Sequence, residues 1–176
     1  MHSLSPLQRI NRWDVELCIF CNRQGRYFII RNLFRIASRL GNGIFWYILM
    51  FALLLRYQGD ALPAVLHMIA VGLAGTAIYK LIKGMTVRPR PFNACSHIVC
   101  MGKTLDQFSF PSGHTLHAVA FSIVAVFYFP ALIWLVLPFS LLVALSRPVL
   151  GLHYPSDVLA GALLGAVLAC LSLMLV

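Results

Sequence analysis

The sequence predicts an all-α membrane protein: a polytopic bundle of about five transmembrane helices, preceded by an amphipathic interfacial segment. Of the 176 residues, 60% are hydrophobic and only 11% are charged, and the mean hydropathy is +0.84. A soluble domain has a far more polar composition. The apolar stretches are continuous and do not alternate, which favours helices over a closed barrel as the means of satisfying backbone polar groups in lipid.

The chain is strongly basic, with 14 lysines and arginines against 5 acidic residues and a net charge of +9. A basic face interleaved with aromatic residues, as nucleic-acid binding requires, is not apparent. We therefore expect an anionic lipid bilayer as the partner and no nucleic acid. The composition implies no cofactor and leaves the oligomeric state open.

Residues 1–39 are expected to lie at the membrane surface. Seven of the eleven arginines precede residue 40, and the apolar run of a signal peptide is missing. Residues from about 4 to 37 are typical of one or two amphipathic helices at the headgroup level. A disordered basic tail is the alternative, which the many aromatic residues disfavour. The expected apolar anchors are Trp13, Leu17, Phe20, Tyr27 and Phe28.

The spans follow from length, because about 20 apolar residues cross a hydrocarbon core of about 30 Å. Residues 84–111 are polar, contain three prolines and are expected to form a loop at the interface. The uncharged run 115–146 is too long for one crossing, and Pro130 is its natural break, since proline cannot continue a helix. The predicted spans are residues 40–57, 61–82, the two halves of 115–146, and 155–176.

The predicted topology brings the polar residues to one place. The second span ends at Lys83, the third begins at His114, the fourth ends at Arg147 and the fifth begins after His153. In an up-and-down bundle these four ends lie on the same membrane face. We therefore expect a single polar site at that face.

The residues expected at this site suit a phosphate group. Lys83, Arg90 and Arg147 supply an ammonium and two guanidinium groups, which bind phosphate oxygens. Ser112 and Gly113 directly precede the third-span helix, where free N–H groups and the helix dipole favour an anion. Gly113 also permits a close backbone approach.

Two histidines and a carboxylate are the candidates for covalent chemistry. Asp157 follows His153 by four residues and is expected to accept the Nδ1 hydrogen of that ring, which exposes Nε2 as an attacking nitrogen. His114 has no carboxylate nearby in the sequence and is the candidate acid that protonates a leaving oxygen.

A bound metal is the rival explanation for histidine and aspartate beside phosphate. Magnesium prefers several carboxylate oxygens, and zinc needs three or four His, Cys or carboxylate ligands. Only Asp106 and Asp157 are expected near the site. The sequence therefore predicts a metal-free site in which arginine takes the place of a cation.

These residues also follow a known spacing. Lys83-x6-Arg90-Pro91, then Pro111-Ser112-Gly113-His114, then Ser146-Arg147-x5-His153-x3-Asp157 resembles the three-part signature of the type 2 phosphatidic acid phosphatase (PAP2) superfamily, the lipid phosphate phosphatases. The resemblance implies a transmembrane catalytic domain over residues 40–176, with the signature within 83–157. Many members have six spans, so this chain is expected to lack the first.

The resemblance also implies roles for individual residues. His153 is implied as the nucleophile that forms a phosphohistidine, Asp157 as its orienting group and His114 as the proton donor. The implied phosphate-binding residues are Lys83, Arg90, Ser112, Gly113 and Arg147.

The expected function is therefore a lipid phosphate phosphatase. Phosphatidic acid, phosphatidylglycerol phosphate, undecaprenyl diphosphate and the 1-phosphate of lipid A are all compatible substrates. A phosphotransferase that passes phosphate from one lipid to another is an alternative. A membrane subunit that binds anionic lipid without turnover is a second one, disfavoured by the complete set of His114, His153 and Asp157.

Several other residues lie outside the signature. Arg88 either anchors headgroups or contacts the phosphate directly. Cys18 and Cys21 are expected to be packing residues, and Cys95 and Cys100 form a disulfide if their loop faces an oxidising compartment. Three further histidines are expected to form hydrogen bonds only: His67, His97 and His117.

Two arguments about sidedness disagree. With five spans the arginine-rich amino terminus lies on the same face as the site, and the positive-inside rule then predicts the cytoplasm. Resemblance to bacterial family members implies the extracytoplasmic, periplasmic face of the inner membrane. We follow the resemblance, because cations that belong to a catalytic site are held there by the site itself.

Overall fold

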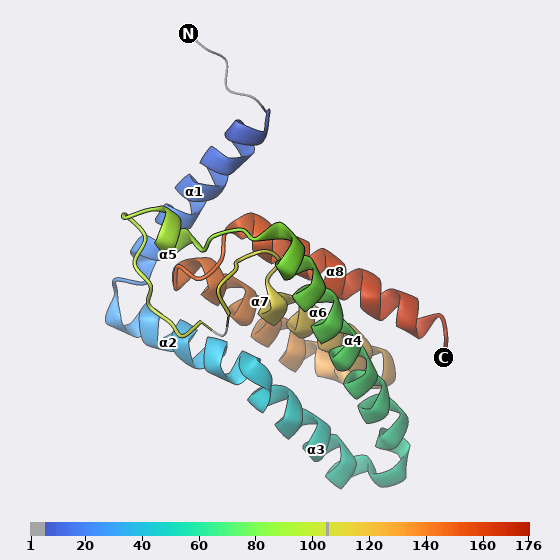
Figure 1. The fold of residues 1–176 in the computed structure, drawn as a ribbon. Helices are drawn as coiled ribbons and strands as arrows, with labels where there is room; N and C mark the ends of the chain where they lie inside the picture. Colours follow the sequence, from blue (N-terminus) through green and yellow to red (C-terminus); the bar gives the residue numbers. More distant parts are fainter. Residues whose placement is uncertain (1–5, 105) are drawn as a thin grey trace.

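The computed structural model describes residues 6–104 and 106–176, and within these ranges the chain is helical without any β-strand, as the sequence predicts (Figure 1). Residues 1–5 of the predicted interfacial segment lie outside the described residues. The helices are α1 (Pro6–Gln24), α2 (Phe28–Arg39), α3 (Phe45–Tyr57), α4 (Leu62–Thr86), α5 (Pro91–Ala94), α6 (Gly113–Tyr128), α7 (Ile133–Val149) and α8 (Pro155–Leu173).

The predicted spans correspond to α3, α4, α6, α7 and α8. Three helical runs are long and apolar enough to cross a membrane, namely 28–86, 130–149 and 155–173, and α6 is a shorter apolar helix. The first run contains α3 and α4, which Figure 1 shows as two antiparallel legs joined by a tight turn. The expected break at Pro130 is confirmed, because α6 ends at Tyr128 and a short 3-10 turn, Pro130–Leu132, precedes α7. The protein is thus an integral membrane protein.

The predicted amphipathic segment forms α1 and α2. Helix α2 continues into α3 through a π-type turn, Leu40–Ile44, which bends at Gly43, where φ is +123°. Glycine adopts this backbone conformation without steric cost. The chain therefore has no break between residues 39 and 40, where the sequence divides the interfacial segment from the first span. The interfacial location itself stays a prediction.

Helix α6 lies at the centre of the bundle and packs against α4, α7 and α8. Two glycines of α8 allow its backbone to approach α6 closely: a Cβ atom on Gly161 would overlap the carbonyl oxygen of Ser112, and one on Gly165 that of Leu116. This contact holds the amino-terminal end of α6 against the first turns of α8.

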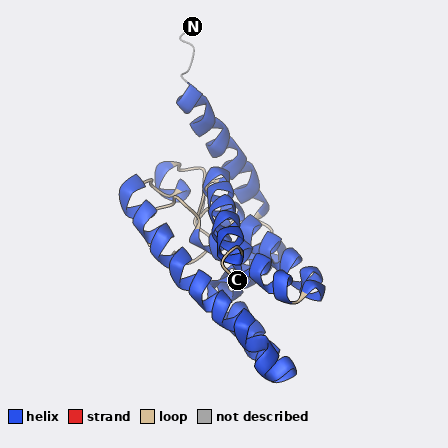
Figure 2. Cartoon of the chain, turned by 90° about the vertical axis from the view of Figure 1, so that its right-hand side faces the viewer, coloured by secondary structure: helices blue, strands red, loops and turns tan. Residues whose placement is uncertain are grey.

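The connections that carry polar residues gather at one end of the bundle. Helix α4 ends at Thr86, slightly beyond the predicted start of the loop at Gly84, and is capped by Val87, whose φ of +47° is left-handed. The loop that follows contains α5 and lies at the same end as α1 and the α7–α8 connection (Figures 1 and 2). The candidate site lies at this end.

Candidate active site

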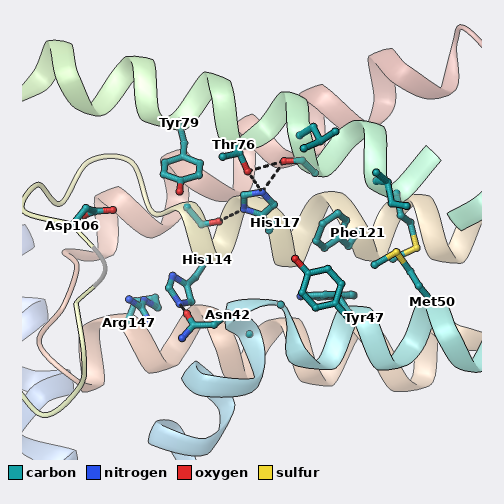
Figure 3. Close-up of a pocket in the computed structure, with 18 of the residues that line it drawn as sticks. Asn42, Tyr47, Met50, Thr76, Tyr79, Asp106, His114, His117, Phe121 and Arg147 are labelled. Atoms are coloured by element: carbon teal, nitrogen blue, oxygen red, sulfur yellow. Dashed lines mark hydrogen bonds between the residues drawn. The ribbon is translucent and has the colours of Figure 1, made fainter. Parts of the chain in front are cut away.

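Three of the four helix ends that the topology predicts to converge, those at Lys83, His114 and Arg147, line a cavity of about 300 Å³ between α3, α4 and α6 (Figure 3). The fourth, at His153, lies next to it. One end of the cavity is polar and the other is apolar. Figure 3 shows Asp106, His114, Asn42 and Arg147 at the polar end. Of the predicted site residues, those that line the cavity are Lys83, Arg90, Gly113, His114 and Arg147.

Three buried cations give the polar end its charge. Lys83 is 6% exposed, Arg90 2% and Arg147 1%. Asp106 is the carboxylate that pairs with this cluster, with one oxygen 2.6 Å from Lys83 Nζ and the other 2.6 Å from Arg90 Nη2. Burial acts to raise the pKa of Asp106, but the hydrogen bond from Lys83 and the charges of Lys83 and Arg90 lower it below its ordinary value. Three cations against one carboxylate leave a positive excess that suits an anion.

Arg147 has an unused hydrogen-bond donor. Its Nη1 donates to Ser38 Oγ on α2 at 2.7 Å, whereas its Nε is buried with no acceptor among the described residues. Leaving a charged donor buried and unpaired is costly, so such a group requires an explanation. An anionic ligand in the cavity would supply one.

His153 lies next to this cluster but does not itself line the cavity. Arg90 Nη1 is 3.4 Å from Nε2 of His153. Because a guanidinium can only donate, Nε2 is the acceptor and carries the lone pair, which places the ring proton on Nδ1. Burial, followed by the charges of Arg147, Arg90 and Lys83, lowers the pKa of His153 well below its ordinary value. The ring is therefore neutral and able to act as a nucleophile near pH 7.

The expected hydrogen bond from His153 to Asp157 is not formed in this structure. His153 Nδ1 lies 3.7 Å from Asp157 Oδ2, which is too long, and has no other partner among the described residues. The carboxylate is engaged elsewhere: Oδ2 accepts the Tyr154 N–H at 2.8 Å, and Oδ1 accepts from Arg88 at 2.6 Å. The two groups are adjacent, as predicted, but not bonded.

His114 points into the cavity from the first turn of α6, as expected (Figure 3). Its Nε2 contacts the side-chain oxygen of Asn42, which lies on the π-type turn before α3. An amide oxygen accepts hydrogen bonds, so this contact places a proton on Nε2. Sequence analysis did not identify Asn42, because its position depends on the π-type turn.

Ser112 makes contacts other than the expected ones to an anion. Its N–H donates to the Asp157 carbonyl oxygen at 3.0 Å, so it is not available to an anion. Its side chain caps α6, with Oγ 3.4 Å from Thr115 N and 2.9 Å from Thr115 Oγ1. Gly113 does line the cavity, and its N–H belongs to the first turn, where helices leave amides without intrahelical partners.

The Arg88 side chain does not line the cavity. It bridges two carboxylates, with Nη1 2.6 Å from Asp157 Oδ1 and Nη2 2.7 Å from Asp14 Oδ2, and its guanidinium stacks on the Tyr154 ring at 4.1 Å. The hypothesis of direct phosphate contact is therefore not supported. Asp14, on α1, was not identified by sequence analysis.

The far end of the cavity is lined by apolar side chains of α3, α4 and α6, including Trp46, Met50, Met68 and Phe121. His117 lies along the wall, where its ring nitrogens contact Thr76 Oγ1 at 3.1 Å and the Gly113 carbonyl oxygen at 2.8 Å. A ligand with a charged head and a hydrocarbon tail matches this division of the cavity.

Metal-ligating residues are not clustered at the site. Within the described parts of the chain, no three His, Cys, Asp or Glu side chains are placed to hold a metal ion. Metal independence itself stays a prediction. Cys95 and Cys100 are free thiols in this structure, without the disulfide that an oxidising compartment would permit.

Comparison with known proteins gives consistent matches. The family model of the PAP2 superfamily matches residues 60–176, which include every signature position. Undecaprenyl-diphosphatase BcrC of Bacillus subtilis (strain 168) is 39% identical over 104 residues, which cover 59% of this chain and 53% of that protein, about half its length. An undecaprenyl-diphosphatase of Sulfolobus acidocaldarius is 27% identical over 161 residues, covering 91% of this chain and 77% of that protein.

The fold has a counterpart among solved structures. The crystal structure of a transmembrane PAP2-type phosphatidylglycerolphosphate phosphatase from Bacillus subtilis superimposes with a TM-score of 0.74, covering 95% of this chain and 86% of that one. The two sequences are 23% identical. The likeness shows the same arrangement of helices.

Proposed function

Because the chain belongs to the PAP2 superfamily, we propose that it is a membrane-embedded, metal-independent phosphatase that removes a phosphate from a lipid phosphate or diphosphate. The observation that carries the proposal is the cavity, which has buried cations and an unpaired arginine nitrogen at one end and apolar side chains at the other. Such a cavity accommodates a phosphorylated headgroup together with the first part of its hydrocarbon chain.

Undecaprenyl diphosphate is the leading candidate substrate. The two curated relatives described above are both named as undecaprenyl-diphosphatases. Phosphatidic acid, phosphatidylglycerol phosphate and the 1-phosphate of lipid A present the same headgroup chemistry and remain in the test panel.

In the proposed first step, the substrate phosphate replaces the Asp106 carboxylate on Lys83 and Arg90. The exchange maintains the charge balance of the two cations, because one anion takes the place of another. Arg147 Nε then gains the acceptor that it lacks. The phosphorus atom arrives next to His153 Nε2, which is 3.4 Å from Arg90 Nη1.

The chemistry then proceeds in two displacements. His153 Nε2 attacks phosphorus, a P–N bond forms and the P–O bond to the lipid breaks. The leaving oxygen takes the Nε2 proton of His114, which donates from its imidazolium form and is left neutral. A water molecule next attacks phosphorus, a new P–O bond forms as the P–N bond to His153 breaks, a proton of the water returns to His114, and inorganic phosphate leaves. The cations and the first amides of α6, beginning with Gly113, stabilise the charge on the equatorial oxygens in both steps.

The proposed location is the bacterial inner membrane, with the site at the periplasmic face and α1 lying in the headgroup region. Trp13, Leu17 and Phe20 are exposed on one side of α1, which supports contact with lipid. Labelling of intact cells with an impermeant thiol reagent tests the sidedness. The Cys170→Ser variant is used, so that Cys100, in the loop, is the exposed cysteine that reacts. Protection of Cys100 that persists after the cells are treated with a reductant, which would open a Cys95–Cys100 disulfide, would contradict a periplasmic site.

The central experiment measures phosphate release from the lipid panel by purified protein, with EDTA present. We expect turnover in the wild type, none in His153→Ala, and unchanged turnover in His97→Ala, which removes an exposed imidazole. Incubation with radiolabelled substrate should trap an acid-labile, His153-dependent adduct.

Other results would point to other functions. Release that depends on a second lipid as acceptor would identify a phosphotransferase. Binding of labelled lipid without release by the wild type would identify a non-catalytic subunit. Full activity of His153→Ala, or loss of wild-type activity in EDTA, would refute the proposed mechanism.

A further inference from the structure

Helix α1 has a buried polar face that points at the catalytic turn. Asp14, Cys18 and Asn22 are spaced by four residues, so they lie on one side of the helix, and all three are buried. Asn22 donates to the carbonyl oxygens of Val99 and Val149, and Cys18 Sγ lies 3.8 Å from the His153 carbonyl oxygen. The helix is therefore fixed against the same segment that carries the nucleophile.

Asp14 is connected to the reaction centre by a short series of ion pairs. It is 5% exposed, and its Oδ2 accepts from Arg88 Nη2 at 2.7 Å. The other terminal nitrogen of Arg88 donates to Asp157 Oδ1 at 2.6 Å. Asp157 is fully buried, and its second oxygen is the one that faces His153 Nδ1.

We propose that Asp14 is a positioning residue for the reaction of the proposed function: it fixes Arg88, and Arg88 fixes the Asp157 carboxylate with one oxygen directed at His153. The amino-terminal helix thus contributes to the active site without touching the substrate.

The geometry of Arg88 explains why Asp14 is needed. A buried carboxylate requires a counter-ion, and Arg88 is the cation that contacts Asp157. A long side chain held at only one end can rotate, whereas Asp14 and the Tyr154 ring hold this guanidinium at its other end and its face. The Asp157 carboxylate consequently has one orientation, with Oδ1 on Arg88 and Oδ2 toward the imidazole.

A purely structural role for Asp14 is the competing explanation. Its carboxylate also accepts the Ser156 N–H at 2.9 Å and contacts the Ser156 hydroxyl, and a carboxylate at a helix amino terminus stabilises the helix. Such a role would change the stability of α8 and the amount of folded protein, but not the turnover of each folded molecule. The experiment must therefore separate kcat from stability.

The test uses full-length protein in lipid vesicles, with kcat and KM per folded molecule measured on the lipid that the wild type hydrolyses fastest. We expect Asp14→Asn to lower kcat about tenfold with KM within about twofold of the wild type, as for a group acting through an orienting carboxylate. Arg88→Gln should lower kcat at least as much. Because Asp14 acts through Arg88, the double variant should be no slower than Arg88→Gln alone.

Two variants serve as controls. Glu16→Gln removes a carboxylate from the exposed side of the same helix, where it pairs with Arg12 at 2.9 Å, and should leave kcat unchanged. Asp14→Glu retains the charge and should recover most of the lost turnover.

An unchanged kcat in folded Asp14→Asn, or losses from Asp14→Asn and Arg88→Gln that multiply in the double variant, would overturn the inference while leaving the proposed function intact. If Asp14→Asn yields no folded protein, Asp14→Glu decides: a kcat no higher than that of Arg88→Gln overturns the inference. A wild type that hydrolyses no lipid of the panel would instead refute the proposed function, and with it this inference.

Discussion

The two sides of the His153 ring differ in how completely their charges are paired. On the cavity side, Lys83 and Arg90 share the carboxylate of Asp106, and Arg147 Nε has no acceptor among the described residues. On the opposite side, Arg88 lies between Asp14 and Asp157, and each of these carboxylates has further hydrogen bonds. The cavity side has more cations than carboxylates and suits an anion, whereas the opposite side already has two carboxylates for one cation.

This difference indicates a division of labour. In the proposed reaction, the cavity side changes its partners during each turnover, because phosphate must enter and leave. The opposite side holds the carboxylate behind the imidazole in one orientation throughout. Variants on the cavity side should therefore affect substrate and phosphate binding as well as rate, whereas variants on the opposite side should affect rate alone.

Arg147→Ala should have the largest effect, because it removes a buried donor that faces the transferred phosphate in the proposed reaction. We expect kcat/KM to fall about 10³-fold, with a rise in KM, as for loss of an oxyanion-stabilising group. Arg12→Ala, on the exposed side of α1, provides the control and should retain full activity. A loss in kcat with KM unchanged would contradict this prediction, because that pattern is the one expected for variants on the side of Asp14 and Asp157.

Asp157→Asn should lower kcat about 10²-fold or more without raising KM, because the amide cannot stabilise the charge that develops on His153 during attack. The measurement is again kcat and KM on the best lipid substrate. A rise in KM with kcat preserved would contradict the distinction between the two sides.

Asp106→Asn should strengthen the binding of inorganic phosphate. Its partly exposed ion pairs with Lys83 and Arg90 are worth up to about 1 kcal/mol, so removing the competing carboxylate should lower the inhibition constant of phosphate roughly fivefold. Asp60→Asn, which removes an exposed carboxylate from the turn between α3 and α4, should leave this constant unchanged. Weaker inhibition in Asp106→Asn would show that the carboxylate assists phosphate binding.

Lowering the pH should have the smallest effect on kcat/KM. Burial and the charges of Arg147 and Arg90 lower the pKa of His153 well below 6.5, so its ring stays unprotonated as the pH falls through that value. Once corrected for the dianionic fraction of a monoester substrate, whose second pKa is about 6, kcat/KM should not decline between pH 7.5 and 6.0. A corrected profile that declines with a midpoint near 6.5 would disagree.

The same shift affects stability with a defined sign. Below pH 6.5 the unfolded chain binds a proton at His153 and the native chain does not, so the free energy of unfolding should fall as the pH drops. His153→Ala should reduce this pH dependence of the melting temperature.

The transmembrane helices and the signature residues could be predicted because their signals are local. Continuous hydropathy and Pro130 determine the spans, and an up-and-down order brings Lys83, His114 and Arg147 together regardless of packing detail. Asp106 and Asp157 were identified as the acids near the site, but their partners were not. Ion pairing depends on side-chain directions that spacing alone does not determine.

The contributions of the amino-terminal helices could not be predicted in this way. Asp14 and Arg88 are 74 residues apart, and the arginines around Asp14 favour an interpretation based on lipid headgroups. The spacing of Asp14, Cys18 and Asn22 is the signal that could have indicated a buried face. Asn42 carries no such signal, because its direction depends on the π-type turn.

That turn, Leu40–Ile44, sets the rotational phase between α2 and α3. One residue of an α-helix corresponds to a rotation of about 100°, so deleting a residue here would turn one helix against the other by more than a quarter of a circle. Ser38 could then not hold Arg147 while Trp46 keeps its buried place in the wall of the cavity. A single-residue deletion would leave the span just as hydrophobic and still able to insert into the membrane. It would nevertheless separate the residues that form the polar end of the cavity.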